Sequence, residues 1–572
     1  MAAWPLAGVE RWLLRTGLFV LPLAYWWDTY DHYVLPKLLV ARTLVIGLLV
    51  LFIVRALMTR SVEIKRTSLD LPWAVFLASA VVSTVLAANP NVAVFGIYSR
   101  YDGLLTIVTY AALFWLSIQT LAGPGDARAL LRVLLASGYA VAAVAMIWSV
   151  ADYRAQGQIV PAYGTLGNSN VLGAFLAMVC PLAYGELVEA RTWGARILAL
   201  NALLVPAAAL VLSFSRSAWL GAAVAFVVIL AGERRTASRI AIAGAALLLT
   251  VAIALPGFTT LGGLGLERAL EARARSVLDL NSWQASRLHI WHDSVTLIAS
   301  RPVFGYGPDN VGLVFPLFQT GNWAPLPGGL AQPIDKAHAE TLQVAATQGL
   351  VGLGAYVFMI VAFIRAFWKG RRNPSALPIF AGWVGYQVTL QLNFSAPPSA
   401  MPFWIFAAGA IEMWTPQPRI VSLPLPNWRV AVGAGAVMIA LLAAVGTAWI
   451  VLPYIADAQL LSAVRADFSG HPDHAAPLAK QARDLWPRES VYAVEVGNLA
   501  FERSDWAAAR NAYLDASQLG TYNPAVYRNL ALADQHLGRL GEAHAAARKA
   551  VELDRFDPAN RALLAQFEAP GP

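Results

Sequence analysis

Long apolar runs are the feature of this sequence that most constrains its fold. Crossing the hydrocarbon core of a bilayer takes roughly 20 mostly apolar residues in a helix. Thirteen candidate runs cover residues 12–28, 36–58, 70–88, 103–121, 130–150, 170–187, 195–214, 217–232, 239–256, 340–367, 376–392, 400–414 and 430–453. We therefore predict an all-α fold, a polytopic membrane helical bundle of about 12–13 transmembrane helices.

The composition of the chain supports a membrane location. Hydrophobic residue types make up 58% of the 572 residues and charged types only 13%, about half the roughly 25% of an ordinary soluble domain. The mean hydropathy is +0.55. These values exclude a disordered chain, a coiled coil and a disulfide scaffold. The single cysteine, Cys180, cannot form an internal disulfide and says nothing about the redox compartment.

The distribution of basic residues predicts the orientation of the bundle. If the N-terminus is cytoplasmic, the inside segments hold 19 Lys and Arg residues, whereas the short outside loops hold five. Basic residues concentrate on the cytoplasmic side of membrane proteins. We therefore expect the N-terminus inside and the C-terminus outside. The net charge of +8 then reflects topology, and we expect no nucleic-acid partner.

Two segments lie outside the membrane in this topology. One is a large external loop at about 257–338, which is far longer than a connector needs to be. The other is the region after the last apolar run. We therefore predict a transmembrane domain at 1–454 and an extracytoplasmic domain at 455–572.

The C-terminal region contains a sequence repeat. Residues 491–524 and 525–558 are each 34 residues long and align without a gap, so that Ala509 matches Ala543 and a proline ends each copy. This period is typical of tetratricopeptide (TPR) repeats, in which pairs of helices pack closely through small residues. We expect each proline to end the second helix of its repeat. The solenoid would either stabilise the C-terminus or provide a docking surface for a protein partner.

Polar residues gather in clusters on the predicted outer side. In a membrane protein, such residues are the first candidates for function. The clusters cover residues 95–103, 163–170, 213–219, 286–292, 301–310 and 335–343. The spans themselves carry almost no Asp or Glu at mid-depth, which disfavours an ion-driven transporter.

These clusters resemble the O-antigen ligase and O-antigen polymerase family of bacterial membrane glycan transferases, over most of residues 90–415. Four motifs are similar to that family: Gly-Asn-Ser-Asn at 167–170, Ser-Arg-Ser-Ala-Trp-Leu-Gly at 215–221, Arg-Pro-Val-Phe-Gly-Tyr-Gly-Pro at 301–308 and His-Ala-Glu-Thr-Leu-Gln at 338–343. A C-terminal TPR domain occurs in some members of the family.

The resemblance implies transfer of a glycan from an undecaprenyl-pyrophosphate carrier to an acceptor hydroxyl, on the outer face of the bacterial cytoplasmic (inner) membrane. It implies that Arg216 and Arg287 bind the donor pyrophosphate and that His338 is catalytic. Guanidinium groups stay charged and bind phosphate oxygens bidentately. A histidine with a pKa of about 6.5 can accept the proton of the hydroxyl. The reaction would be an inverting displacement that needs no metal or other cofactor.

Each of these residues also has a purely structural interpretation. Arg216 could extend its charged end to the lipid headgroups, Arg287 could be a solvated loop arginine, and His338 could simply begin a helix. Three further polar residues are possible site residues: Arg100, Asn168 and Asn170. Arg100 would be a second phosphate contact or a topology residue, and the two asparagines are turn and cap residues or sugar ligands.

A metal site finds little support in the sequence. His289 and His292 have i, i+3 spacing on a predicted helix, but no third ligand follows at a zinc spacing. Asp28 and Asp31 are similar to an acidic motif of metal-dependent sugar transferases, but a helix cap explains them better. We therefore predict no metal.

Several functional alternatives remain open at this stage. The acceptor could be the lipid A core, the growing polysaccharide or a protein hydroxyl, with membrane lipids and, through the TPR domain, a protein as further partners. A lipid-linked glycan flippase or exporter would bind the same lipid diphosphate with arginines. Only a transferase needs His338 as a base.

Overall fold

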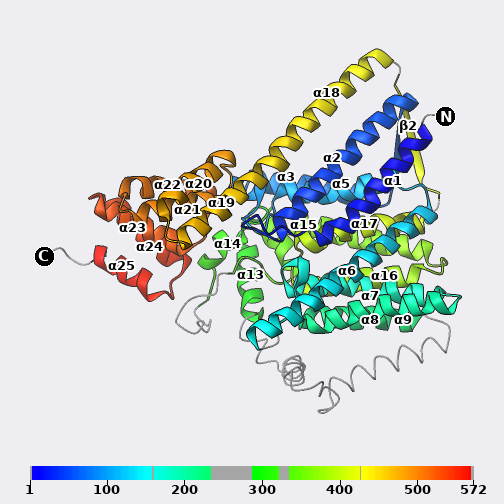
Figure 1. Ribbon diagram of the computed structural model, residues 1–572, viewed down its shortest axis with the longest axis horizontal. Coiled ribbons are helices and arrows are strands. Elements are labelled where there is room, and N and C mark those ends of the chain that lie inside the picture. Colours follow the sequence, from blue (N-terminus) through cyan, green and yellow to red (C-terminus); the bar gives the residue numbers. More distant parts are fainter. Residues whose placement is uncertain are drawn as a thin grey trace, which may run out of the picture.

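The chain folds into a helical bundle followed by a helical repeat array (Figure 1). The computed structural model describes residues 3–157, 160–232, 287–320, 334–415, 417–425 and 427–568. Within these ranges the regular structure is helical apart from one two-stranded sheet. The predicted all-α membrane bundle with a helical repeat region is confirmed.

The bundle comprises most of the helices of the described chain. Its α-helices are α1 (Ala3–Val20), α2 (Val34–Thr59), α3 (Asp70–Val85), α4 (Pro90–Phe95), α5 (Leu104–Thr120), α6 (Pro124–Gln156), α7 (Ser169–Glu189), α8 (Trp193–Leu212), α9 (Arg216–Gly232), α13 (His289–Ser300), α14 (Val311–Val314), α15 (Glu340–Gly370), α16 (Ala376–Gln391), α17 (Pro397–Trp414) and α18 (Trp428–Gly446). Short turns of 3-10 helix lie at η1 (Leu21–Leu23), η2 (Gly164–Leu166) and η4 (Phe315–Leu317).

Six of the described helices are long and apolar enough to cross a membrane. They are α2, α6, α7, α8, α15 and the continuous helix that begins with α18. Three shorter apolar helices, α3, α5 and α9, lie beside them. Together these helices make the chain a multi-pass membrane protein.

Most predicted apolar runs coincide with helices, with two exceptions. The first run was placed too far along the chain: α1 ends at Val20, because Pro22 follows in a 3-10 turn, whereas the run 12–28 continued beyond it. The run at 239–256 lies outside the described residues, as does most of the loop at 257–338. The described segment 287–320 of that loop contains α13, α14 and η4.

A short antiparallel sheet links two loops at one end of the bundle. Strand β1 (Ser61–Arg66) pairs with β2 (Arg419–Pro424), and Ser61 lies opposite Pro424. The sheet follows α2, whose last turn ends at Arg60 in a left-handed conformation (φ 54°). It lies with the N-terminus at the end of the bundle opposite the repeats (Figure 1). The sequence analysis did not predict these strands.

Helix α7 occupies the centre of the bundle. Every residue from Val171 to Tyr184 is buried, and the helix packs against α8, α9 and α16. Close packing of α9 on α16 depends on Gly221, where an added Cβ would lie 2.2 Å from Thr389 Oγ1. These contacts set the position of the N-terminus of α9, where Arg216 lies.

The repeat array consists of helix pairs stacked side by side. Its helices are α19 (Leu452–Phe468), α20 (Pro472–Leu485), α21 (Ser490–Glu502), α22 (Trp506–Leu519), α23 (Pro524–His536), α24 (Leu540–Leu553) and α25 (Pro558–Glu568). The aligned residues Ala509 and Ala543 are fully buried between helices. Small side chains at these positions let the two helices of each pair approach closely.

One detail of the repeat prediction is wrong. Pro524 and Pro558 do not end the second helix of a repeat; each occupies the first turn of the next helix, α23 and α25. Proline suits this position because the first turn of a helix leaves its N–H groups unpaired. The second helices end earlier, at Leu519 and Leu553.

A single helix carries the chain from the bundle into the repeats. Helix α18 passes through the π-helical turn η5 (Thr447–Val451) into α19 without a break, over Trp428–Phe468 (Figure 1). Its 41 residues span about 60 Å, roughly twice the thickness of the hydrocarbon core. The proposed domain boundary at 454/455 therefore lies inside a continuous helix.

Candidate active site

A buried lysine anchors the loop that leads into α15. The ammonium of Lys336 donates to the carboxylates of Asp102 and Asp309, each at 2.7 Å. Burial alone would lower the pKa of this lysine, but the two carboxylates raise it, so the lysine stays charged. An ion triad of this kind holds the loop 334–339 against the loop 101–103 and the turn before α14. It therefore fixes the backbone two residues before His338.

His338 lies at the end of this loop in a strained backbone conformation. Its φ is +52°, in the left-handed region that residues with a side chain rarely adopt. The indole N–H of Trp291 donates to the His338 carbonyl oxygen at 3.4 Å. Its imidazole Nδ1 is buried and has no hydrogen-bond partner among the described residues. The ring is half-buried beside Phe394, with ring centres 5.2 Å apart.

Positive charges surround this imidazole. Burial lowers the pKa of His338 to about 4, and the guanidinium of Arg287 is the next largest cause. Arg100 and Lys336 lower the pKa further, whereas Asp335 raises it. The imidazole is therefore neutral at physiological pH. Neutral imidazole is the form that can accept a proton.

Phe394, in the turn between α16 and α17, is the point where these side chains meet. The Arg100 guanidinium carbon lies 5.6 Å from the centre of its ring, and Lys336 Nζ lies 6.0 Å from it. Arg287 donates to the carbonyl oxygen of Leu392, two residues earlier. The structure therefore brings together Arg287, Arg100 and His338, which lie far apart in the sequence.

Arg100 has a partner that the sequence analysis did not assign. Its Nε lies 2.5 Å from the carboxylate of Asp335. Of the cations around His338, Arg100 is thus paired with a carboxylate of the same loop. Arg100 holds the loop in place and keeps only part of its charge for a ligand.

The packing of α9 against α16 places Arg216 at the same end of the bundle. The two helices are antiparallel, since Gly221 lies against Thr389 and Gly232 lies against Leu377. Extending this register by about one turn places Arg216 opposite the turn after α16, which contains Phe394. Arg216 is half-buried. Phe214, two residues before it, has a positive φ of 51°, as His338 does.

The two asparagines of the 163–170 cluster have different roles. Asn168 caps α7 by accepting hydrogen bonds from the backbone N–H groups of Asn170 (2.8 Å) and Val171 (3.3 Å), as the cap interpretation predicts. The side chain of Asn170 instead accepts a hydrogen bond from Ser215 Oγ at 2.8 Å. Asn170 therefore ties the start of α7 to the residue that precedes Arg216.

Backbone strain is concentrated around these residues. Seven residues other than glycine have a positive φ among those the structure describes. Five of the seven flank or belong to the site: Ser99, Tyr101, Phe214, Asp309 and His338. Such conformations cost of order 1–3 kcal/mol each and cluster at functional sites. Their positions here give independent support for a functional site.

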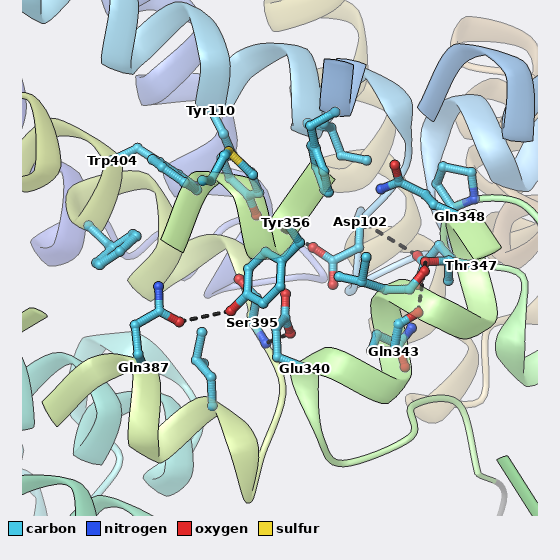
Figure 2. Close-up of a pocket in the computed structure, with 18 of the residues that line it drawn as sticks. Asp102, Tyr110, Glu340, Gln343, Thr347, Gln348, Tyr356, Gln387, Ser395 and Trp404 are labelled. Carbon is cyan, nitrogen blue, oxygen red and sulfur yellow. Dashed lines mark hydrogen bonds between the residues drawn. The ribbon is translucent and has the colours of Figure 1, made fainter. Parts of the chain in front are cut away.

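An internal cavity of about 100 Å³ lies behind the loop (Figure 2). Asp102, Glu340 and Ser395 face it together with Tyr356, whose hydroxyl donates to Gln387 at 2.8 Å. The Glu340 carboxylate accepts the backbone N–H of Ser395 at 2.8 Å. Most of its other walls are aromatic and aliphatic side chains. The cavity therefore places the carboxyl group of Glu340, two residues after His338, against an enclosed space.

The sequence analysis listed the outer polar clusters but assigned no role to several residues that shape the site. They are Asp102, Asp309, Asp335, Lys336 and Glu340. The available signal was charge: acidic and basic residues occur together in three outer clusters of a chain with few charges. Two of the pairings, Lys336 with Asp102 and Arg100 with Asp335, join residues more than 200 positions apart.

The acidic and histidine residues considered as metal ligands contact protein groups in the structure. Asp31 accepts the backbone N–H groups of Tyr33, Val34 and Leu35 at the start of α2, so the helix-cap interpretation is confirmed for this residue. Asp28 instead accepts the hydroxyl of Tyr454 at 2.5 Å. His292 lies 3.1 Å from the carboxylate of its neighbour Asp293. Within the described ranges, no group of three or more His, Cys, Asp or Glu residues is arranged to hold a metal.

The repeat array packs directly on the outer rim of this site. Tyr522, in the loop between α22 and α23, lies against Gly312 next to Asp335. Burial raises the pKa of the Tyr522 phenol to about 12, with Asp335 as the next cause. Asn91, in α4, donates to the carbonyl oxygens of Arg488 (3.0 Å) and Leu519 (3.1 Å). The repeats are therefore a fixed wall of the site.

The fold and the site together define a class of protein: a multi-pass helical membrane protein with a partly buried, charged site at one end of its bundle and helical repeats packed against that site. Residues 201–357 match a family model described as O-Antigen ligase. This segment is therefore similar to O-antigen ligases, as the motifs within it predicted. Arg216, Arg287 and His338 all lie within the matched segment. The match supports glycan transfer of the O-antigen ligase and polymerase type.

Searches for other similar proteins found matches to repeat proteins. One solved structure, "Arabidopsis OM64 TPR domain", is 16% identical, covers 20% of this chain and 96% of its own, and has a TM-score of 0.20. Another, "Crystal structure of APC/C hetero-tetramer Cut9-Hcn1", is 13% identical, covers 81% of this chain and 91% of its own, and has a TM-score of 0.19. A search of the curated proteins found no match.

Proposed function

We propose that this protein transfers a glycan from an undecaprenyl-pyrophosphate carrier to an acceptor hydroxyl, on the outer face of the bacterial cytoplasmic membrane. The N-terminus would be cytoplasmic, and the repeats would be extracytoplasmic above the site. The reaction is an inverting displacement in which no metal takes part. The general activity, glycan transfer of the O-antigen ligase type, is supported by the match of residues 201–357 to the family model.

One observation carries the proposal: His338 is a neutral, strained imidazole that lies among the cations Arg287, Arg100 and Lys336. Guanidinium groups beside a neutral base suit a reaction in which an anion leaves while a hydroxyl loses its proton. A structural histidine at a helix start would need neither the strain nor the surrounding cations.

Arg287 and Arg216 would bind the donor diphosphate. As the bond from the anomeric carbon to the diphosphate oxygen breaks, negative charge grows on that oxygen. Guanidinium groups stabilise this charge through bidentate hydrogen bonds. Arg287 is at the required place because it lies beside His338. Arg216 is at the same end of the bundle by the register of α9 on α16.

The proposed step balances without a further reactant. The acceptor oxygen attacks the anomeric carbon and forms the new glycosidic bond as the bond from that carbon to the diphosphate oxygen breaks. The bonding electron pair leaves with the undecaprenyl diphosphate. The acceptor proton passes to the imidazole of His338, which becomes imidazolium. A single displacement inverts the anomeric configuration.

Donor binding would also adjust the base. When no donor is bound, burial and the guanidinium of Arg287 lower the pKa of His338 to about 4. An anion near an imidazole favours its protonated form. The bound diphosphate therefore offsets the field of Arg287 and raises the pKa of His338. The base becomes stronger only when the donor is in place.

The acceptor defines three possible versions of this function. A lipid A core makes the protein a ligase, the growing glycan makes it a polymerase, and a protein hydroxyl makes it an oligosaccharyltransferase. The TPR array next to the site favours a protein acceptor or an assembly partner, because it presents a peptide-binding type of fold. Mass spectrometry of surface glycoconjugates with and without the gene distinguishes the three.

The test is glycan transfer by the purified full chain, reconstituted in liposomes with an undecaprenyl-diphosphate-linked oligosaccharide and a candidate acceptor. We expect His338→Ala to abolish transfer while donor binding persists. The matched control is His292→Ala, because this side chain is exposed and lies on α13. Intact transfer by His338→Ala would mean that the base assignment is wrong.

The same experiment addresses the flippase alternative. A flippase moves the donor across the bilayer without needing a base, so His338→Ala would leave its transport unchanged. Donor translocation without any glycosidic product, in the wild-type protein as in the variant, would favour the flippase.

A further inference from the structure

A second cavity lies at the end of the bundle opposite His338. It has a volume of about 1490 Å³ and opens between α6, α8 and the loop from α7 to α8. Helix α7 links the two ends: it starts beside the residue that precedes Arg216, and its last residue, Glu189, lines this cavity. The proposed transfer reaction therefore leaves this cavity without a role.

The mouth of the cavity carries an excess of positive charge. Its charged lining residues are Arg128, Arg132, Arg191, Arg196, Glu186 and Glu189. Two of the arginines are neutralised: Arg128 pairs with Glu189 at 2.9 Å, and Arg132 pairs with Glu186 at 3.0 Å. No carboxylate in the described part of the chain pairs with Arg191 or Arg196.

The held side chain of Arg196 and the start of α8 add to the preference of this mouth for anions. Arg196 donates to the carbonyl oxygen of Ala190 at 3.3 Å and lies over the ring of Trp193, which holds its side chain at the mouth. The 20-residue helix α8 also begins here, with Thr192 as its cap. The N-terminus of a helix carries partial positive charge and binds anions.

The interior of the cavity is apolar and elongated. Leu135, Ala136 and Tyr139 from α6 face Ala199 and Ala202 from α8. From Thr192 to Ala202 the helix rises by about 15 Å. The cavity thus extends from the cationic mouth toward the middle of the membrane, along a seam kept open by small side chains.

The outer face of α8 shows what surrounds the cavity. Trp193 is 78% exposed, Ile197 65% and Leu198 72%. Large apolar side chains with this exposure in a membrane helix face lipid, and tryptophan is typical of the headgroup level. The cavity is therefore accessible from the bilayer at the depth of the phosphate groups.

We propose that this cavity is a binding site for an anionic phospholipid of the leaflet opposite the transfer site. The phosphate group lies between Arg191, Arg196 and the start of α8, and an acyl chain follows the α6–α8 seam. Basic pockets between membrane helices on the cytoplasmic side are known to bind such headgroups. A glycerophospholipid is preferred over the polyprenyl carrier, because the carrier would be used at the other membrane face, about 30 Å away.

The test compares lipid retention by native mass spectrometry of the purified full chain. The protein is extracted from liposomes of equimolar phosphatidylcholine and phosphatidylglycerol, and we expect it to retain phosphatidylglycerol selectively. Arg191→Gln with Arg196→Gln should weaken this retention by about 30-fold, since each basic residue near an anionic surface contributes about fivefold. The matched control is Arg371→Gln with Arg372→Gln, two exposed arginines at the same end of the bundle but outside the cavity.

A second variant keeps the charges and blocks the interior. Ala195→Trp fills the cavity near its mouth, and it should also reduce retention while thermal unfolding and glycan transfer stay near wild type. Equal retention of both lipids by the wild-type protein would overturn the proposal. So would unchanged phosphatidylglycerol retention in both variants, or displacement of the lipid by undecaprenyl phosphate at equal concentration. None of these outcomes depends on the transfer mechanism.

Discussion

At the residue scale, the burial of His338 and the cations around it determine how the rate of glycan transfer depends on pH. The free protein holds the pKa of His338 at about 4 instead of 6.5. A base must be unprotonated to act, so activity falls as the pH drops below its pKa. Because donor binding offsets Arg287, the pKa in the complex lies above that of the free protein.

The two kinetic constants should therefore have different acid limbs. The kcat/KM value reports the free enzyme, and we expect its acid limb near pH 4; kcat reports the complex, and its limb should lie at higher pH. Arg287→Gln should move the kcat/KM limb upward, because it removes the second-largest cause of the low pKa. The measurement is the initial rate of glycan transfer across a pH series. An acid limb of kcat/KM at 6.5 that Arg287→Gln does not move would contradict this environment.

Lys336 supplies a prediction about stability. It is fully buried between Asp102 and Asp309. Lys336→Met leaves two buried carboxylates without their shared cation, and breaking a buried ion pair in this way costs about 3–5 kcal/mol. We expect a lower midpoint of thermal unfolding in detergent and loss of transfer. Lys369→Met removes an exposed lysine from the same chain and should change neither quantity.

Individual site residues could be predicted from the sequence only through their resemblance to a known family. Arg287 and His338 were assigned from family resemblance, and the structure places them together. The ion triad could not be predicted, because no local pattern shows that Asp102, Asp309 and Lys336 share one buried position. The backbone strain at His338 is likewise set by contacts that form only in the folded bundle.

At the element scale, the seam between α9 and α16 controls where Arg216 lies. Gly221 is in contact with α16: an added Cβ would lie 2.2 Å from Thr389 Oγ1 and 2.4 Å from the carbonyl oxygen of Gly385. Backbone cannot yield without the two helices moving apart. A larger residue at this position therefore shifts the start of α9 and with it the guanidinium of Arg216.

We expect Gly221→Leu to lower kcat/KM of glycan transfer by about 100-fold, since a displacement of about 1 Å in a positioning group can cost that much. The matched control is Gly354→Leu in α15, where no atom lies within 4 Å of the added Cβ. Thermal unfolding of both variants separates loss of positioning from loss of folding. A Gly221→Leu protein with wild-type kcat/KM would show that Arg216 is not held by this seam.

The positions of the helices were what the sequence predicted best. Apolar runs from 36–58 to 217–232, and from 340–367 onward, fall on helices, because a bilayer imposes length and hydropathy on each span. The strands β1 and β2 were missed because each has only six residues and its partner lies far along the chain. The role of the repeat prolines was wrong because a proline between two helices can end one or begin the next.

At the scale of the whole molecule, the repeats and the bundle form one structure around the site. Asp457 in α19 accepts the backbone N–H of Asp31 at 2.8 Å and the hydroxyl of Tyr98. The Asn91 bonds join residues about 400 positions apart in the sequence. Such distant contacts have no local signature, so the sequence predicted a repeat domain without showing that it is docked on the bundle.

This docking predicts that the repeats act on the rate of transfer even when no protein partner is present. Asn89 caps α4 through its side-chain oxygen and donates from its nitrogen to the carbonyl oxygen of Gln518 at 3.1 Å. Asn89→Asp with Asn91→Asp keeps the cap acceptor but removes three hydrogen bonds to the repeats, each contributing about 1 kcal/mol. Since the loop of residues 95–103 carries Arg100 beneath these contacts, we expect it to exchange amide hydrogens faster and transfer to slow by tenfold or more. Asn427→Asp makes the same chemical change at the cap of α18 and should leave both unchanged. Wild-type rates in the double variant would mean that the repeats contribute only through a partner, and the wall they form would then have no part in positioning Arg100.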